Sequence, residues 1–237
     1  MAALRILVFG HSGSLALRPP RQSRQEGTYV DLLRRHVTES CGADAAVVNL
    51  ALRSNMVNQD DLRFTCDIQR HDPDVVVLHY GVNECAPRVL PRPIWMWLHG
   101  FADQGWLRRR LGSWLMPMEV LLMRLVSCGG WLSAAKFERC LRFKIASVRK
   151  EAACRVLVVN IGPPNERYRR MLPGIERQVL RFNEVIARVA AESGALLMDV
   201  QGMVTAGGLE QLQPDGCHLS AEGHRQLFEM IKRACGD

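Results

Sequence analysis

Hydrophobic residues form five short runs along the chain, separated by longer amphipathic stretches. The runs are rich in Val, Leu and Ile at consecutive positions, so both faces of each predicted strand avoid water. Strands of this kind belong to a parallel sheet that helices cover on both sides. The five predicted strands are Leu4–Phe9, Ala45–Leu50, Asp74–Tyr80, Arg155–Ile161 and Ala195–Val200. The alternation predicts an α/β fold with a parallel sheet of about five strands.

Apolar residues at helical spacing lie between these runs. Thr28–Thr38 and Ile175–Ala190 each place their large apolar side chains on one face, which predicts two covering helices. A last helix is expected to begin near Ser220, because its hydroxyl can accept from the free amides of the first turn and Glu222 complements the helix dipole.

A stretch of some fifty residues, about 86–135, does not fit the simple alternation of strand and helix. It contains all five tryptophans, and we call it the tryptophan-rich insertion. Leu111–Leu132 is apolar and helical in character, but charged residues and Gly129–Gly130 interrupt it, so a membrane-spanning helix is not expected. We expect a lid over the active site. Peripheral membrane contact through residues 95–132 and a buried dimer contact are the alternatives.

Length and composition are those of an ordinary globular protein: 237 residues, 48% apolar and 23% charged. We expect one domain over residues 1–237, because no repeat or change of composition divides the chain. The net charge of +7 comes from dispersed arginines, so a nucleic-acid partner is not expected. The eight cysteines include no CxxC pair, and the first strand begins close to Met1, which predicts a cytoplasmic protein. The oligomeric state stays open.

Chemically useful residues follow the predicted strands, where an open parallel sheet binds its ligands. Ser12 lies in a Gly-flanked turn after the first strand, and Asp215 precedes His218 by three residues. Ester cleavage needs a hydroxyl nucleophile, an imidazole base and a carboxylate that orients the imidazole. We therefore predict Ser12 as the nucleophile, His218 as the base and Asp215 as its partner, with Gly216 allowing the tight turn between them.

Ester cleavage also needs donors for the developing oxyanion. The side-chain amide of Asn83 and the backbone N–H groups of Ser12 and Ser54 are the candidates. This chemistry uses protein groups alone, and the sequence contains no cluster with metal-ligand spacing, so neither a metal nor a cofactor is expected.

Four short motifs resemble the conserved blocks of the SGNH (GDSL-like) hydrolases. They occur in the same order as in that family and extend over nearly the whole chain. The resemblance implies a flavodoxin-like three-layer α/β/α sandwich and a serine hydrolase that works through an acyl-enzyme. The motifs are Gly10-His11-Ser12, Asn49–Ser54, Gly81-Val82-Asn83-Glu84 and Asp215-Gly216-Cys217-His218.

Three positions depart from the pattern of this family. His11 stands where the family has Asp, Ser54 where it has Gly, and Glu84 where it has Asp. A second imidazole beside the nucleophile can change its hydrogen bonding, and the Ser54 side chain can narrow the pocket. These departures motivate one alternative, a catalytically silent relative that binds a saccharide or a partner protein.

The segment from Glu84 to Arg88 is also similar to SGNH-like proteins associated with bacterial surface-polysaccharide synthesis. This similarity implies a small-molecule or saccharide ester as substrate, such as an O-acetylated carbohydrate, with Arg53 or Arg88 contacting a carboxylate or phosphate. Transfer of the acyl group to a sugar instead of water is a close variant that the sequence does not separate from hydrolysis.

A phosphate-binding loop is the other interpretation of the turn at Ser12. It requires a helix that begins at once, so that free amides meet the phosphate. The sequence Leu17-Arg18-Pro19-Pro20 argues against such a helix, because the residue before each proline is pushed out of the helical region. We therefore favour the nucleophile.

Overall fold

The computed structural model describes residues 4–15, 27–42, 45–59, 61–99, 106–125 and 128–236. The Leu17–Pro20 segment lies outside these residues. Five parallel strands form one sheet in the order β2-β1-β3-β4-β5, which is the flavodoxin-like order. The α/β prediction is thereby confirmed. The strands are β1 (Arg5–Gly10), β2 (Ala46–Asn49), β3 (Val75–His79), β4 (Arg155–Val159) and β5 (Leu196–Met198).

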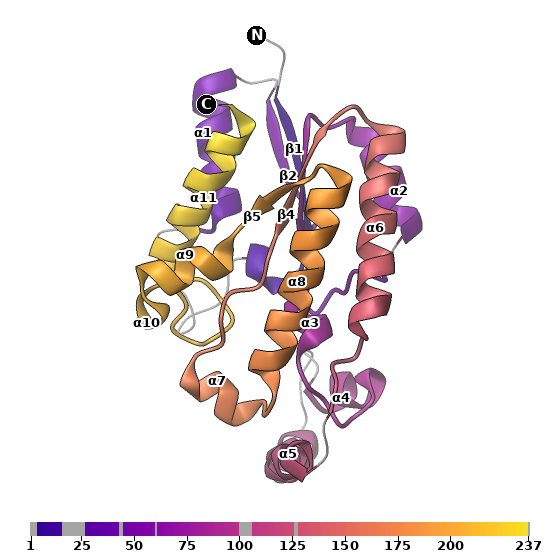
Figure 1. The fold of residues 1–237 in the computed structure, drawn as a ribbon, viewed down its shortest axis with the longest axis vertical. Coiled ribbons are helices and arrows are strands. Elements are labelled where there is room, and N and C mark those ends of the chain that lie inside the picture. The colour runs from indigo at the N-terminus through magenta and orange to yellow at the C-terminus, as the bar shows by residue number, and fades with distance from the viewer. Residues whose placement is uncertain are drawn as a thin grey trace.

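Helices cover both faces of this sheet (Figure 1). Helices α2, α6 and α8 pack on one face, and α1, α9, α10 and α11 pack on the other. The bounds are α1 (Tyr29–Cys41), α2 (Asp61–His71), α3 (Val82–Cys85), α4 (Arg92–His99), α5 (Trp106–Leu125), α6 (Ala134–Glu151), α7 (Glu166–Met171), α8 (Ile175–Ser193), α9 (Val200–Gly207), α10 (Leu209–Leu212) and α11 (Ala221–Cys235).

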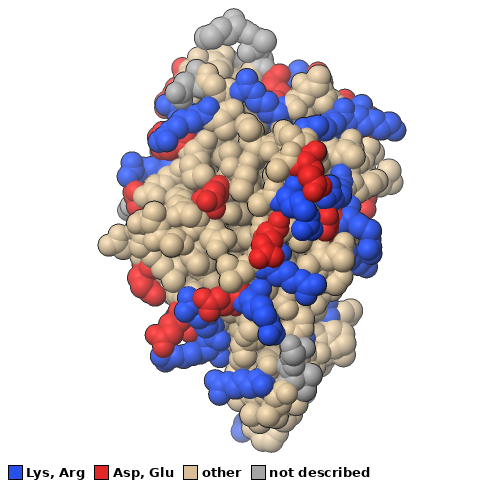
Figure 2. All heavy atoms as spheres, in the orientation of Figure 1, with Lys and Arg blue, Asp and Glu red and all other residues tan. Residues whose placement is uncertain are grey.

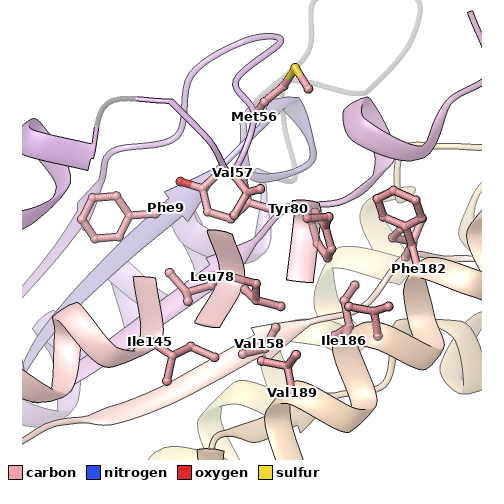
Figure 3. Close-up of a cluster of buried hydrophobic side chains, with 14 of the residues drawn as sticks. Phe9, Met56, Val57, Leu78, Tyr80, Ile145, Val158, Phe182, Ile186 and Val189 are labelled. Carbon is pink, nitrogen blue, oxygen red and sulfur yellow. The ribbon is translucent and has the colours of Figure 1, made fainter. Parts of the chain in front are cut away.

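Two apolar cores result, because successive side chains of a strand point to opposite faces of the sheet. Leu7 and Phe9 of β1 enter the core under α2, α6 and α8, whereas Ile6 and Val8 enter the core under α1 and α11. Figure 3 shows part of the first core, where Leu78 and Val158 of the sheet meet Ile145 of α6. The consecutive apolar residues of the sequence are thus buried on both sides.

The predicted helices exist, with small differences at their ends. Thr28 caps α1 by accepting from the N–H of Asp31, whose carboxylate accepts from the N–H of Thr28 in return. Ser220 caps α11, as predicted, by accepting from the N–H of Gly223. The last strand is shorter than predicted, because the Asp199 carboxylate accepts from the N–H of Gly202 and begins α9. Helices α9 and α10, which were not predicted, lie between this strand and Asp215.

The tryptophan-rich insertion follows β3 and contains two helices among its described residues, α4 and α5. The stretch predicted as helical from Leu111 to Leu132 stops earlier, since α5 ends at Leu125, before Gly129. Within the described ranges, none of the helices combines the length and hydropathy needed to cross a bilayer. Figure 1 places α5 beyond the carboxyl ends of the strands.

Candidate active site

Ser12 lies at the carboxyl end of β1, beside the place where β1 and β3 pair and the strand order reverses. This is where open α/β sheets bind their ligands. His11 caps the short 3-10 helix Ser12–Ser14, because its Nδ1 accepts from the N–H of Gly13 at 3.0 Å. A Cβ on Gly13 would lie 2.8 Å from a ring carbon of His79, so only glycine fits there. The tight turn leaves the half-buried Ser12 hydroxyl facing His218.

The three residues predicted as nucleophile, base and carboxylate form one hydrogen-bonded chain. Ser12 Oγ lies 3.0 Å from His218 Nε2, and His218 Nδ1 lies 2.8 Å from Asp215 Oδ2. The carboxylate accepts from Nδ1–H, which leaves Nε2 as the acceptor for the serine hydroxyl. In this arrangement the imidazole can remove the proton from Ser12.

The loop that carries Asp215 and His218 is held in a defined conformation. Asp215 Oδ1 accepts from the backbone N–H of Cys217 and of His218, at 2.9 and 2.7 Å. Gly216 has φ +86°, and a Cβ there would lie 2.5 Å from the side chain of Asn165. Asn165 itself donates to the carbonyl of Pro214. The predicted turn at Gly216 is therefore present, and Asn165 is an anchor that the sequence did not indicate.

The electrostatics keep Asp215 ionised. Partial burial alone would raise the pKa of this carboxyl, but the hydrogen bond and charge of His218, together with the two backbone N–H groups, lower it to about 2. A carboxylate that stays charged at neutral pH stabilises the imidazolium that forms when His218 takes a proton.

The oxyanion candidates lie on the loops that follow β2 and β3. Asn83 Nδ2 donates to the carbonyl of Asn55 at 2.9 Å, which orients its amide and leaves the second N–H for another acceptor. Ser54 has φ +54°, a conformation that favours glycine and that the serine adopts here. Among the loop and turn hydrogen bonds of the described residues, none uses the backbone N–H of Ser12 or Ser54.

Glu84 connects the loop that follows β2 to the loop that follows β3. Its buried carboxylate accepts from the N–H of Val57 at 2.6 Å and from the N–H of Gly81 at 2.9 Å. Burial raises the pKa of Glu84 to about 7, although both hydrogen bonds and the charge of Arg92 act in the opposite direction. Glu84, which is one methylene longer than the Asp of the family, thus holds the loops of Ser54 and Asn83 together through hydrogen bonds.

His11 is buried and faces other imidazoles behind the nucleophile turn. Its ring lies 4.8 Å from that of His79, and burial, His79 and His218 lower its pKa well below the usual value. His79 shares the Ser14 hydroxyl with Tyr29. The neutral His11 ring therefore acts as a helix cap behind the nucleophile turn.

The two predicted substrate-binding arginines have different surroundings. Arg53 is exposed on the loop before Ser54. The guanidinium of Arg88 lies 5.0 Å from the ring centre of Trp95 and 5.4 Å from that of Trp131. Arg88 thus stabilises the start of the tryptophan-rich insertion through cation–π contacts. A substrate contact by either arginine stays a prediction.

Arg92 of α4 contacts the loop that carries Ser54, which the sequence did not indicate. Its Nη2 donates to the carbonyl of Ser54 at 3.1 Å and to Gln59 Oε1 at 3.2 Å. This contact joins the tryptophan-rich insertion to the loop that carries Ser54. The motif pattern gives no signal for it, because the two residues are far apart in sequence.

The structure also brings together a group that the sequence spacing did not indicate. Asp215, Cys217 and His218 each offer a ligand atom, and these atoms lie within 4.8 Å of one another. A metal ion there would compete with Asp215 for His218 Nδ1, which lies 3.0 Å from Cys217 Sγ. The residues beside the proposed base thus include one carboxylate, one thiol and one imidazole within reach of a single ion.

The fold and this site define an α/β protein with a Ser-His-Asp arrangement at the carboxyl edge of its sheet. The model of the GDSL-like lipase/acylhydrolase family matches residues 9–226. The chain therefore belongs to the GDSL-like lipase/acylhydrolase family. No curated protein sequence matches closely enough to count as a relative.

Solved structures with the same fold extend over nearly the whole chain. A lipase/acylhydrolase from Enterococcus faecalis aligns with a TM-score of 0.65 at 19% identity, over 98% of this chain and 94% of its own. A catalytic mutant of an acetylxylan esterase from Geobacillus stearothermophilus aligns with a TM-score of 0.63 at 18% identity, over 99% and 94%. A further acetyl xylan esterase gives 0.65 at 20% identity, over 98% and 99%. At these identities the similarity concerns the fold.

Proposed function

We propose that the protein is a serine hydrolase that cleaves a carboxylic ester through an acyl-enzyme on Ser12. The hydrogen-bonded chain from Ser12 through His218 to Asp215 carries this proposal. A serine hydroxyl becomes nucleophilic when an oriented imidazole accepts its proton, and all three groups lie within hydrogen-bond distance.

In the proposed mechanism, Ser12 Oγ attacks the ester carbonyl carbon while His218 Nε2 takes the hydroxyl proton. The tetrahedral oxyanion accepts from Asn83 Nδ2–H and from the N–H groups of Ser12 and Ser54. His218 then gives its proton to the leaving alcohol, and the C–O bond of the ester breaks. A water molecule then loses a proton to His218 and attacks the carbonyl carbon of the acyl-Ser12 ester. The bond from that carbon to Ser12 Oγ breaks, His218 returns the proton to Ser12 Oγ, and the acid leaves.

For the substrate we propose an O-acyl carbohydrate, with a small acyl group such as acetyl. Two of the three solved structures described above are acetylxylan esterases. The segment from Glu84 to Arg88 is similar to SGNH-like proteins associated with bacterial surface-polysaccharide synthesis. A sugar hydroxyl that replaces water in the second step would make the same machinery an acyltransferase. Mass analysis of products formed with and without an added sugar acceptor separates the two outcomes.

A cytoplasmic location is part of the same proposal. No disulfide links any of the eight cysteines, all of which lie in described parts of the chain. Free thiols in this number suit a reducing compartment.

A fluorophosphonate probe tests the nucleophile directly. We expect one adduct per chain, on the peptide that contains Ser12, because only an activated serine attacks the phosphorus at an appreciable rate. Heat-denatured protein is the control and should stay unlabelled. An intact, folded sample without an adduct on Ser12 would favour the catalytically silent alternative.

The amide of Asn83 gives a second test. We expect Asn83→Ala to lower kcat for p-nitrophenyl acetate by roughly 10²- to 10³-fold with little change in KM, because the amide stabilises charge that exists only in the transition state. Asn83→Asp has nearly the same shape but lacks the N–H donor, so it should lose at least as much. A folded Asn83→Ala protein with an unchanged kcat would remove Asn83 from the oxyanion site.

A further inference from the structure

The outer face of α5 is apolar and exposed. Five large side chains recur at spacings of three or four residues, which places them on one side of the helix. We call them the outer stripe. They are Leu111 (41% exposed), Trp114 (77%), Met118 (49%), Leu121 (53%) and Leu125 (72%).

The opposite face of the same helix packs against the rest of the protein. Gly112, Glu119 and Met123 are buried there, and the Glu119 carboxylate is close to the N–H of Val89 at 3.4 Å. A surface helix of a globular protein normally turns its polar side chains outward. Here the charged Glu119 points inward and the outer stripe faces solvent, so the stripe needs an explanation other than folding of this chain.

Neighbouring side chains extend the stripe. Helix α4 packs against α5 and exposes Ile94 and Trp97. Trp106, at the start of α5, is 65% exposed. Tryptophan is enriched where protein meets the headgroup region of a bilayer, because its ring is apolar and its N–H prefers a polar neighbour.

Among the side chains of α4 and α5 that the structure describes, the exposed charged ones are arginines. Arg110 and Arg124 are exposed on α5, and the Arg110 guanidinium lies 5.4 Å from the ring centre of Trp106. Residues 92–125 contain five arginines and two acids, and of the acids Glu119 is buried while Asp103 lies outside the described residues. In Figure 2 the narrow lower end is mostly tan, with blue and without red on the visible face.

We propose that the outer stripe and its flanking arginines bind the surface of an anionic lipid bilayer. An amphipathic helix with Trp and Leu on one side and arginine beside them inserts shallowly between headgroups, where the cations meet lipid phosphates. A second copy of this chain fits less well, because a symmetric contact across α5 would bring the same arginines together.

The binding surface and the candidate active site lie at the same end of the molecule. Both are beyond the carboxyl ends of the strands (Figure 1), and Arg92 joins α4 to the carbonyl of Ser54. A bound bilayer would therefore hold the site near the membrane surface. The proposal concerns binding and does not depend on whether Ser12 is catalytic.

Vesicle flotation with the full-length protein tests the proposal. We expect the protein to float with vesicles of phosphatidylcholine and phosphatidylglycerol at low salt, and much less with phosphatidylcholine alone. Arg110→Gln combined with Arg124→Gln should weaken binding to the anionic vesicles roughly tenfold or more. Trp114→Ser combined with Leu121→Ser should abolish flotation at low and high salt, because it removes the inserting side chains.

Matched variants elsewhere on the surface are the controls. Leu62 of α2 is 80% exposed and Arg139 of α6 is exposed, so Leu62→Ser and Arg139→Gln should float like the unaltered protein. Hydrolysis of soluble p-nitrophenyl acetate should be unchanged in all these variants, which separates a failure of docking from a failure of the proposed function.

Two results would overturn the proposal. One is an unaltered protein that stays at the bottom of the gradient with anionic vesicles at low salt. The other is a dimer in light scattering that Trp114→Ser with Leu121→Ser converts to a monomer, since the stripe would then be covered by a second copy.

Discussion

Replacing Ser12 with alanine is expected to lower kcat for ester hydrolysis by roughly 10⁴- to 10⁶-fold, the range found when a serine nucleophile of this type is removed. In the proposed mechanism the Ser12 hydroxyl forms the acyl-enzyme, so no neighbouring group can replace it. Its half-buried side chain contacts His218 and little else that holds the fold, and the melting temperature should therefore change little. Steady-state kinetics on p-nitrophenyl acetate and circular dichroism provide the two measurements.

Ser14→Ala is the matched control for this experiment. Ser14 lies in the same turn, but its buried hydroxyl contacts Tyr29 at 2.7 Å and His79 at 3.1 Å instead of His218. Its loss should cost stability, because two buried polar groups lose a partner, and should leave most of the activity of the folded protein. Similar activity losses in the two variants would contradict a specific role for Ser12.

Acid is expected to unfold the protein near pH 4, because three buried histidines must take up protons. Burial, together with His224 and His218, lowers the pKa of His79 to about 3, and burial with His218 lowers that of His224 to about 4. His11 shifts in the same direction. In the unfolded chain the pKa of histidine is near 6.5. The stability of the folded state therefore has its full value above that pH, where all three imidazoles are neutral, and falls as the pH decreases towards 3.

The size of this effect follows from the folded and unfolded pKa values of His79 and His224. Each pH unit between them is worth about 1.4 kcal/mol, so at pH 4 these two histidines together cost several kcal/mol, and His11 acts in the same direction. Glu84 opposes them, because burial raises its pKa to about 7 and the folded state therefore gains stability as the pH falls from 7 to about 4.5. Below about pH 4.5 Glu84 is protonated in both states and adds no further stability, so the free energy of unfolding falls more steeply with pH. The net cost at pH 4 is a few kcal/mol, a large fraction of the roughly 5–15 kcal/mol that stabilises a typical domain.

Thermal and acid titrations of a His224 variant check this account. We expect His224→Gln to move the acid midpoint to lower pH, since one proton-binding group is gone and no hydrogen bond to its buried Nδ1 is lost. His71→Gln, at the partly exposed end of α2, should leave the midpoint unchanged. A midpoint that is the same in both variants and in the unaltered protein would show that other groups control acid unfolding.

The strands were predictable because a parallel strand buried on both faces leaves a local signal, a short continuous apolar run such as Val75–His79. Helices α9 and α10 were missed because they are short and because the Asp199 cap that ends β5 lies inside a run that reads as strand. The hydrogen bond from the N–H of Gly202 to Asp199 favours a helix over a longer strand at this point. The pattern of apolar residues alone does not indicate such a bond.

Within the candidate site, the motifs at strand ends were predictable because each is continuous in sequence. The 3.0 Å distance between Ser12 and His218 is a different case, because β1 and β5 are not adjacent and α9 and α10 lie between β5 and His218. The roles of Glu84 and Arg92 were not predictable, because both act on backbone groups of a loop that is distant in sequence. Contacts of this kind depend on how loops approach in space, so only the folded structure identifies them.

The bond from Arg92 to the carbonyl of Ser54 limits how this chain can be shortened. Deleting residues 92–125 to shorten the protein would also remove this bond, which holds the backbone of a proposed oxyanion donor. A helix taken from another protein of the family would need an arginine at the same place to restore the bond. Helix α4 and the loop of Ser54 should therefore be kept together when either of them is redesigned.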